Sequence, residues 1–271
     1  MKPFFSIITV TKNTEKKIDL TIRSVLSQNF NNFEYIIVDG CSADNTFVKI
    51  IKYKNNKKIR IFKRRDKNFY DGLNYAVRKA KGNYISILNS GDIYFSNKIL
   101  KNMQNNILKH KNFDFYFSNL VYYNKKKEVK RIWKSSELKN NLSDAFKIAH
   151  PTIFLANKVA KKYKYNDNYN ISADLDFILK LIQNNITYKY LNFFSIGMEA
   201  KGMSSSLNYS IIKLQEDLNI HKSYFKDYIF NFFEQKLKKI NSVTLFNKKA
   251  FSNLISRNIF NLKLNKNSYK L

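Results

Sequence analysis

The chain has 271 residues, of which 44% are hydrophobic, so it can bury a sizeable core and is too apolar for wholesale disorder. This length suits one large α/β domain with an appendage, or two small domains. Lys and Arg number 49 against 20 acids, and the formal net charge of +29 attracts polyanions such as nucleic acid, an anionic membrane or phosphorylated substrates. An A+T-rich genome, whose codons favour Lys, Asn, Ile, Phe and Tyr, explains the same excess without any function.

Cys41 is the only cysteine, which excludes an internal disulfide and fits a thiol-reducing compartment. The apolar run after Met1 stops at Thr11, too early for a signal peptide. No run approaches the ~18 apolar residues of a membrane span. We therefore expect a cytoplasmic protein, either soluble or lying peripherally on the inner face of the cytoplasmic membrane.

Strands and helices alternate in the first part of the chain. Runs of β-branched and aromatic residues predict strands at 4–10, 33–38, 59–62 and 84–88. The spacing of apolar residues predicts helices that start after Thr14, start after Asp44, and span 70–81 with a stop at Gly82. Such alternation implies right-handed βαβ units and a parallel sheet with helices on both faces.

The pattern changes after about residue 112. Strands are predicted at 113–123, 129–133, 152–155 and 186–196, with a helix opening at Ser136 and an amphipathic helix over 174–184. From about residue 208 the chain reads as mostly helical, basic and aromatic. No Gly-, Ser- or Pro-rich linker marks a boundary between these parts.

Polar residues at the carboxyl ends of the predicted strands are the candidates for a site, because ligands of parallel sheets bind there. Thr11-Lys12-Asn13 follows the first strand, Asp39 the second, and Asn89-Ser90-Gly91-Asp92 the fourth. The carboxylate of Asp92 is a hard oxygen ligand that suits Mg²⁺ or Mn²⁺. Alternatively, Asp92 lies solvated in an ordinary turn, and Asp39 and Asp44 merely form a turn and a helix cap.

Three blocks of the chain resemble family 2 glycosyltransferases, nucleotide-sugar enzymes with the GT-A fold. The blocks are "FFSIITVTKNTEKKIDLTIRSVLSQNFNNFEYIIVDGCSADNT", "RRDKNFYDGLNYAVRKAKGNYISILNSGD" and "ISADLDFILKL". The resemblance covers roughly residues 3–215 and is nearest to the bacterial capsule, colanic-acid and lipopolysaccharide type. It implies a Rossmann-like, mostly parallel sheet flanked by helices, with a nucleotide-sugar half (1–112), an acceptor half (113–215) and a basic helical extension (216–271).

The resemblance also assigns the donor side of the site. A UDP-sugar is the expected donor, and the residues expected to contact it are Thr9, Asn13, Asp39, Asp66, Asp71, Asn74, Asn89, Ser90 and Gly91. Asp92 would hold the Mn²⁺ or Mg²⁺ cofactor. Asn89 departs from the acid-x-acid pattern of many relatives, so the site has one carboxylate where they have two.

Asp174 and Asp176 are the candidates for the catalytic base on the acceptor side. Two positions on a helix differ by about 200°, so both cannot face one pocket. The resemblance favours Asp174, which would take a proton from the acceptor hydroxyl in a single inverting displacement. Asp176 is the alternative base, and a simple electrostatic preference of both acids for a helix N-terminus is the other explanation.

His150, Lys201 and Ser204 are expected on the acceptor or diphosphate side of the site. A structural histidine and a surface linker are the alternatives for these positions. The expected acceptor is a glycan or a lipid-linked sugar. Ile229, Phe232, Phe233, Leu237 and Ile240 form one apolar face of a helix with lysines beside it, which suits either an anionic bilayer or packing onto the domain.

Two other functions fit parts of the composition. A nucleotidylyltransferase would need a glycine-rich phosphate loop after the first strand, and residues 11–15 contain no glycine. A nucleic-acid-binding protein would concentrate its basic residues in one stripe, whereas the lysines here are spread along the chain. A Rossmann dehydrogenase is disfavoured because no G-x-G-x-x-G follows the first strand. We therefore expect a metal-assisted glycosyltransferase without a nucleic-acid partner.

Overall fold

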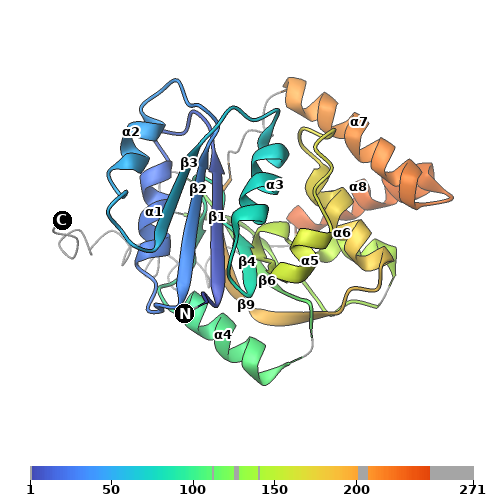
Figure 1. Cartoon of the computed structure of the whole chain (residues 1–271). Helices are drawn as coiled ribbons and strands as arrows, with labels where there is room; N and C mark the ends of the chain where they lie inside the picture. The colour runs from blue at the N-terminus through green and yellow to red at the C-terminus, as the bar shows by residue number, and fades with distance from the viewer. Residues whose placement is uncertain (1, 112, 125–127, 140, 201–206, 245–271) are drawn as a thin grey trace.

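A computed structural model describes residues 2–111, 113–124, 128–139, 141–200 and 207–244. Figure 1 shows a central sheet with helices on both of its sides. The strands are β1 (Phe5–Thr11), β2 (Phe33–Asp39), β3 (Ile59–Lys63), β4 (Tyr84–Ile87), β5 (Ile93–Tyr94), β6 (Phe115–Tyr123), β7 (Val129–Trp133), β8 (Phe154–Ala156) and β9 (Tyr188–Glu199). The helices are α1 (Ile18–Leu26), α2 (Thr46–Ile51), α3 (Phe69–Lys79), α4 (Ile99–Lys109), α5 (Asn157–Lys162), α6 (Ala173–Gln183), α7 (Leu207–Tyr224) and α8 (Tyr228–Thr244), with short 3₁₀ helices η1 (Leu142–Lys147) and η2 (His150–Thr152).

The strands follow the order β3-β2-β1-β4-β8-β6-β9-β5, and β7 pairs with β6. β1 to β4 are parallel to one another, whereas β8 runs antiparallel to both β4 and β6. The chain builds outward from β1 through β2 to β3 and then returns to the other side of β1 with β4. That reversal opens a crevice at the carboxyl ends of β1 and β4, where open α/β sheets bind ligands. The predicted α/β sheet flanked by helices is confirmed.

The core lies on both faces of the sheet. All seven residues of β1 are buried, as expected of a central strand covered on both sides. Gly82 was predicted to stop α3, but α3 ends at Lys79 and Ala80 is already extended. Gly82 instead allows close approach to β1, because a Cβ there would lie 2.5 Å from the backbone nitrogen of Ser6.

Further local predictions differ from the structure. No helix begins at Ser136. Instead, η1 begins at Leu142, because the carboxylate of Asp144 accepts the backbone N–H groups of Lys139 and Asn141 and closes a local turn. Thr14 does not cap α1 with its side chain, which bonds instead to Ser90 at 3.1 Å. Asp44 accepts the backbone N–H of Thr46, the first residue of α2, at 2.9 Å, but the residue at the N-cap is Asn45 and not the predicted Asp44.

The helices α7 and α8 lie beside α6, on the side of the molecule away from α1 and α2 (Figure 1). The boundary predicted at residues 215/216 lies within α7, and the division into domains stays a prediction. The predicted apolar face of α8 is split: Phe232 is buried against His221, whereas Phe233 and Leu237 are exposed. Among the residues that the structure describes, no helix has the length and apolarity to cross a membrane.

Candidate active site

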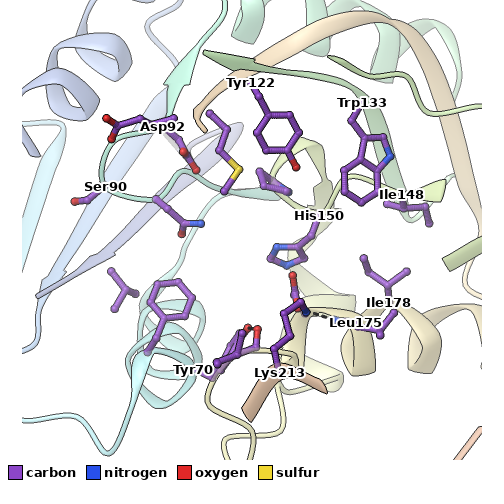
Figure 2. A pocket seen from close by; sticks show the side chains of 18 of the residues that line it. Tyr70, Ser90, Asp92, Tyr122, Trp133, Ile148, His150, Leu175, Ile178 and Lys213 are labelled. Carbon is purple, nitrogen blue, oxygen red and sulfur yellow. Dashed lines mark hydrogen bonds between the residues drawn. The ribbon is translucent and has the colours of Figure 1, made fainter. Parts of the chain in front are cut away.

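A cavity of about 1810 Å³ opens at the carboxyl ends of β1 and β4. One wall comes from the first half of the chain and contains residues 10–17, 66–70, 89, 90 and 92. The other wall comes from β6, β7, η1, η2 and α6, and the helices α7 and α8 close one side. Figure 2 shows Ser90 and Asp92 on one side of this space, Trp133 and Ile178 on the other, and His150 between them.

Seven of the predicted site residues line this cavity: Asn13, Asp66, Asn89, Ser90, Asp92, His150 and Asp174. The other predicted positions within the described residues do not line it, namely Thr9, Asp39, Asp71, Asn74, Gly91 and Asp176. Lys201 and Ser204 lie outside the described residues. The structure therefore places Asp92, the predicted metal ligand, and Asp174, the predicted base, in the lining of one cavity.

The loops after β1 and β2 are tied together around Asp39. Its carboxylate is fully buried and accepts the backbone N–H of Ser42 at 2.9 Å and the Ser42 hydroxyl at 2.6 Å. Asn13 has a φ of 53° and accepts the backbone N–H of Ala43 at 2.8 Å. This is the turn that the alternative interpretation expected, and the contact of Asp39 with a donor stays a prediction.

Arg64 holds the two acids near the start of α3. Its guanidinium lies 2.8 Å from a carboxylate oxygen of Asp66 and 2.9 Å from one of Asp71. Burial raises the pKa of Asp66, and Arg64 opposes that shift only in part. Asn74 has a structural role, since its side chain bonds both the N–H and the C=O of Tyr165. Thr9 likewise has a contact within the core, where its hydroxyl forms a hydrogen bond with the hydroxyl of Tyr35.

Three hydrogen bonds fix the backbone that carries Asp92. Gly91 has a φ of 99°, a conformation that favours glycine. Its N–H donates to Thr21 at 2.8 Å, and its carbonyl accepts the hydroxyl of Tyr123 at 2.6 Å. The Thr21 hydroxyl also donates to the carbonyl of Asp92 at 2.9 Å. The corner is therefore organised before any ligand arrives.

The side chain of Asp92 is 3% exposed, and its Oδ2 atom has no hydrogen-bond partner among the described residues. The side-chain oxygen of Asn89 also has no hydrogen-bond partner among these residues. Burial raises the pKa of Asp92 to about 8, while Lys17 lowers it and Glu199 raises it further. A buried carboxylate with an unused oxygen suits a cation, because the cation offsets the penalty of keeping the group charged.

Glu199, at the end of β9, is a carboxylate near this corner that the sequence analysis missed. It forms an ion pair of 2.6 Å with Lys17, and one of its oxygens would lie 3.8 Å from a Cβ placed on Gly91. Within the described residues no three His, Cys, Asp or Glu side chains gather as a metal cluster. At this corner, the oxygens that could hold a divalent cation are those of Asp92, the amide oxygen of Asn89 and, with Lys17 displaced, those of Glu199.

The first turn of α6 separates the two candidate bases. Asp174 lines the cavity and accepts the backbone N–H of Leu175 at 2.9 Å. Asp176 is buried on another side of the helix, where it bonds the hydroxyl of Tyr224 at 3.0 Å and Lys180 at 3.2 Å. The side chains of Asp174 and Asp176 therefore point in different directions from the helix, as expected. Of the two acids, Asp174 is the one that reaches the cavity.

His150 lies beside the base-side wall. Its Nε2 atom is 2.9 Å from the hydroxyl of Tyr165, which stacks on Phe177 of α6 and on Tyr70 of α3. Burial lowers the pKa of His150, and the nearby charge of Asp174 raises it in part. His150 is therefore a mainly neutral donor or acceptor next to Asp174 near pH 7.

Comparison with known proteins identifies the family. Residues 6–170 match the family described as Glycosyl transferase family 2, which is more than half of the chain. The chain belongs to this family. The protein is a glycosyltransferase, as its sequence blocks predicted.

Two curated relatives show the extent of the similarity. The glycosyltransferase is 31% identical over 206 residues to an uncharacterized glycosyltransferase of Methanocaldococcus jannaschii, a match that covers 71% of this chain and 69% of that protein. It is 31% identical over 119 residues to the UDP-Glc:alpha-D-GlcNAc-diphosphoundecaprenol beta-1,3-glucosyltransferase WfgD of Escherichia coli. That match covers 44% of this chain, which spans only 46% of WfgD.

Two solved structures share the fold. S. aureus TarS 1-349 in complex with UDP-GlcNAc matches 97% of this chain and 76% of its own with a TM-score of 0.67 and 20% identity. The mannosyltransferase PcManGT from Pyrobaculum calidifontis, in complex with GDP-Man and Mn²⁺, matches 97% and 74% with a TM-score of 0.60 and 11% identity. The predicted GT-A fold is confirmed.

Proposed function

We propose that this glycosyltransferase moves a sugar from a nucleoside-diphosphate sugar to an acceptor hydroxyl, with inversion at the anomeric carbon. One observation carries the proposal: Asp92 from the first half of the chain and Asp174 from the second half line the same cavity. An inverting transfer needs a charge-neutralising centre at the leaving diphosphate and a base at the acceptor. The two acids offer these two roles within one space.

The donor is proposed to be a UDP-sugar. The name of WfgD gives UDP-Glc as its donor, and TarS was solved with UDP-GlcNAc. In this chain Asn13, Asp66 and Ser90 offer polar side chains along the donor wall. The buried Asp39 turn lies behind them and would fix the loop against which the nucleoside rests.

A divalent cation, Mn²⁺ or Mg²⁺, is the proposed cofactor. Asp92 would hold it through the oxygen that has no hydrogen-bond partner among the residues the structure describes, with Asn89 supplying a second oxygen. When bound, such an ion neutralises the charge that develops on the leaving diphosphate. PcManGT, which shares the fold, was solved with Mn²⁺.

Asp174 is the proposed general base. It would take the proton of the acceptor hydroxyl while that oxygen bonds to the anomeric carbon. The bond from the anomeric carbon to the diphosphate breaks in the same step, and the nucleoside diphosphate leaves with the electron pair. His150, beside Asp174, would donate or accept a hydrogen bond on the acceptor without carrying charge.

The acceptor is proposed to be a lipid-linked or surface glycan that the protein meets at the inner face of the cytoplasmic membrane. The name of WfgD gives a diphosphoundecaprenol-linked sugar as its acceptor. Here α7 and α8, which border the cavity, expose a set of apolar side chains: Ile211, Leu214, Leu218, Ile229, Phe230, Phe233 and Leu237. Residues 207–271 also carry twelve Lys or Arg against four acids, which suits an anionic bilayer.

Flotation with phosphatidylglycerol-containing vesicles tests the membrane contact. Ile211→Ser combined with Phe233→Ser removes two exposed apolar side chains and should abolish flotation. Val48→Ser combined with Leu108→Ser, which are 54% and 50% exposed on other helices, is the matched control and should float normally. Equal flotation of both double variants would remove the membrane contact from the proposal.

A product assay tests the reaction itself. The protein is incubated with Mn²⁺ and a panel of UDP-, GDP- and dTDP-sugars, and the release of nucleoside diphosphate is compared with that of pyrophosphate. Nucleoside diphosphate is the expected product, and Asp92→Ala should abolish its release. Pyrophosphate as the product would replace the transferase proposal with the nucleotidylyltransferase alternative.

A further inference from the structure

Two acids of α7, Glu216 and Asp217, hold the segment that leads into α6. Both are buried, at 8% and 4% exposure, although acids seldom are without partners. We infer that these residues position the base Asp174, an inference that rests on the proposed role of Asp174. Glu216 does not line the cavity and acts through the backbone of residues 170–172, whereas Asp217 lines the cavity and acts through the side chain of Ser172.

Glu216 binds three successive backbone N–H groups. Its carboxylate accepts from Asn170 at 2.7 Å, from Ile171 at 2.9 Å and from Ser172 at 2.9 Å. Successive N–H groups that converge in this way form an anion-binding nest. In this protein the anion is supplied by α7, about 45 residues further along the chain.

Asp217 fixes the same segment through a side chain. It accepts the hydroxyl of Ser172, the residue before α6, at 2.6 Å. The ammonium groups of Lys213 and Lys236 lie 3.2 Å and 2.6 Å from its carboxylate. Burial of Asp217 opposes its charge, but the two lysines keep its pKa below the usual value. Lys236 belongs to α8, so both C-terminal helices take part.

The other side of the segment is held by α3. The hydroxyl of Tyr70 donates to the carbonyl of Ile171 at 2.6 Å. The peptide groups before α6 are therefore fixed between α3 and α7, and Asp174 follows Ser172 by two residues. A base must lie within hydrogen-bond reach of the proton that it takes, and a displacement of about 1 Å can lower a rate about 100-fold.

A purely structural role is the competing explanation, and the chain offers a matched control for it. Glu34 is also buried, at 6% exposure. Its carboxylate accepts hydrogen bonds from the backbone N–H of Lys81 and, at 2.7 Å, from the hydroxyl of Ser6. It also forms an ion pair of 2.7 Å with Arg60. It lies at the opposite end of the sheet from the cavity and does not line it. Glu34→Gln should therefore destabilise the fold without moving the base.

The test compares Glu216→Gln with Glu34→Gln in the full chain. The probes are UDP-glucose and UDP-GlcNAc with Mn²⁺, with water as the acceptor, and the readouts are kcat and KM for UDP release. We expect Glu216→Gln to lower kcat by about tenfold or more and to leave the donor KM within about twofold. Glu34→Gln should leave both constants within about twofold of the wild type.

Hydrogen exchange supplies a readout that does not depend on activity. Glu216→Gln should remove the protection of the amides of residues 170–172, whereas Glu34→Gln should not. Wild-type kcat in Glu216→Gln, or unchanged protection of these amides, overturns the inference. If the wild type releases no nucleoside diphosphate from either sugar nucleotide, the proposed function is what fails, and the exchange result still decides whether α7 holds the segment.

Discussion

Gly91→Ala tests whether the corner that carries Asp92 is fixed as described. At a φ of 99° an Ala side chain is strained, which costs roughly 1–3 kcal/mol. The new Cβ would meet the Cδ atom of Lys17 at 3.2 Å, a contact that a flexible side chain relieves easily. The backbone could relax only by losing the hydrogen bonds to Thr21 and Tyr123, which are worth about 1 kcal/mol each. Relaxation therefore saves little, and we expect a loss of about 1–3 kcal/mol.

Thermal unfolding and donor binding measure this effect. A loss of that size lowers the Tm of a chain this long by roughly 2–12 °C. Calorimetry with UDP and Mn²⁺ should also show weaker binding, because Asp92 follows Gly91 directly. Gly40→Ala is the control, since Gly40 has an ordinary φ and the nearest atom to its added Cβ lies 3.4 Å away, in the side chain of Lys12. If Gly91→Ala matches Gly40→Ala in Tm and the wild type in UDP affinity, the description of the corner is wrong.

Three further predictions follow from individual contacts. Gly82→Ala should lower the Tm, because its Cβ would lie 2.5 Å from the backbone of β1, and a Tm at or above wild type would contradict that packing. Without metal, burial keeps Asp92 protonated in the folded protein up to its raised pKa of about 8. Protonation of the buried group stabilises the fold fully below pH 4, and this stabilisation is lost as the pH rises to 8. Asp92→Asn in EDTA should therefore raise the Tm at pH 8, and an unchanged or lower Tm would count against the buried, unpartnered carboxylate. Asp174→Asn should cut turnover at least tenfold and preserve UDP affinity, whereas Asp176→Asn should mainly lower the Tm; the opposite pattern would make Asp176 the base.

Local patterns in the sequence were sufficient to predict strands of the sheet and several residues that line the cavity. The β-branched runs predicted β1 to β4, and the rule that ligands bind at strand carboxyl ends led to Asn89, Ser90 and Asp92. The helical period predicts that Asp174 and Asp176 point in different directions. The strands and the place of these residues in the cavity lining could be predicted because each depends on residues that are close together in the chain, whereas the roles of the residues stay predictions.

Contacts between distant parts of the chain explain what the sequence did not reveal. Glu199 was missed because the last strand was predicted to end at residue 196, whereas pairing with β6 carries β9 to Glu199. Nothing near Glu216 in the sequence indicates that its partners are the amides of residues 170–172. The contacts of Asn74 with Tyr165 and of Asp71 with Arg64 likewise arise only in the folded chain, and the contact of these two residues with the donor stays a prediction.

The family match ends at residue 170, but the carboxylate that holds Asn170 to Ser172 is on α7. Removing α7 and α8 would thus leave three amide groups without their carboxylate partner and the start of α6 without this anchor. If α7 anchors the start of α6 in this way, exchanging the C-terminal helices between relatives should also change turnover.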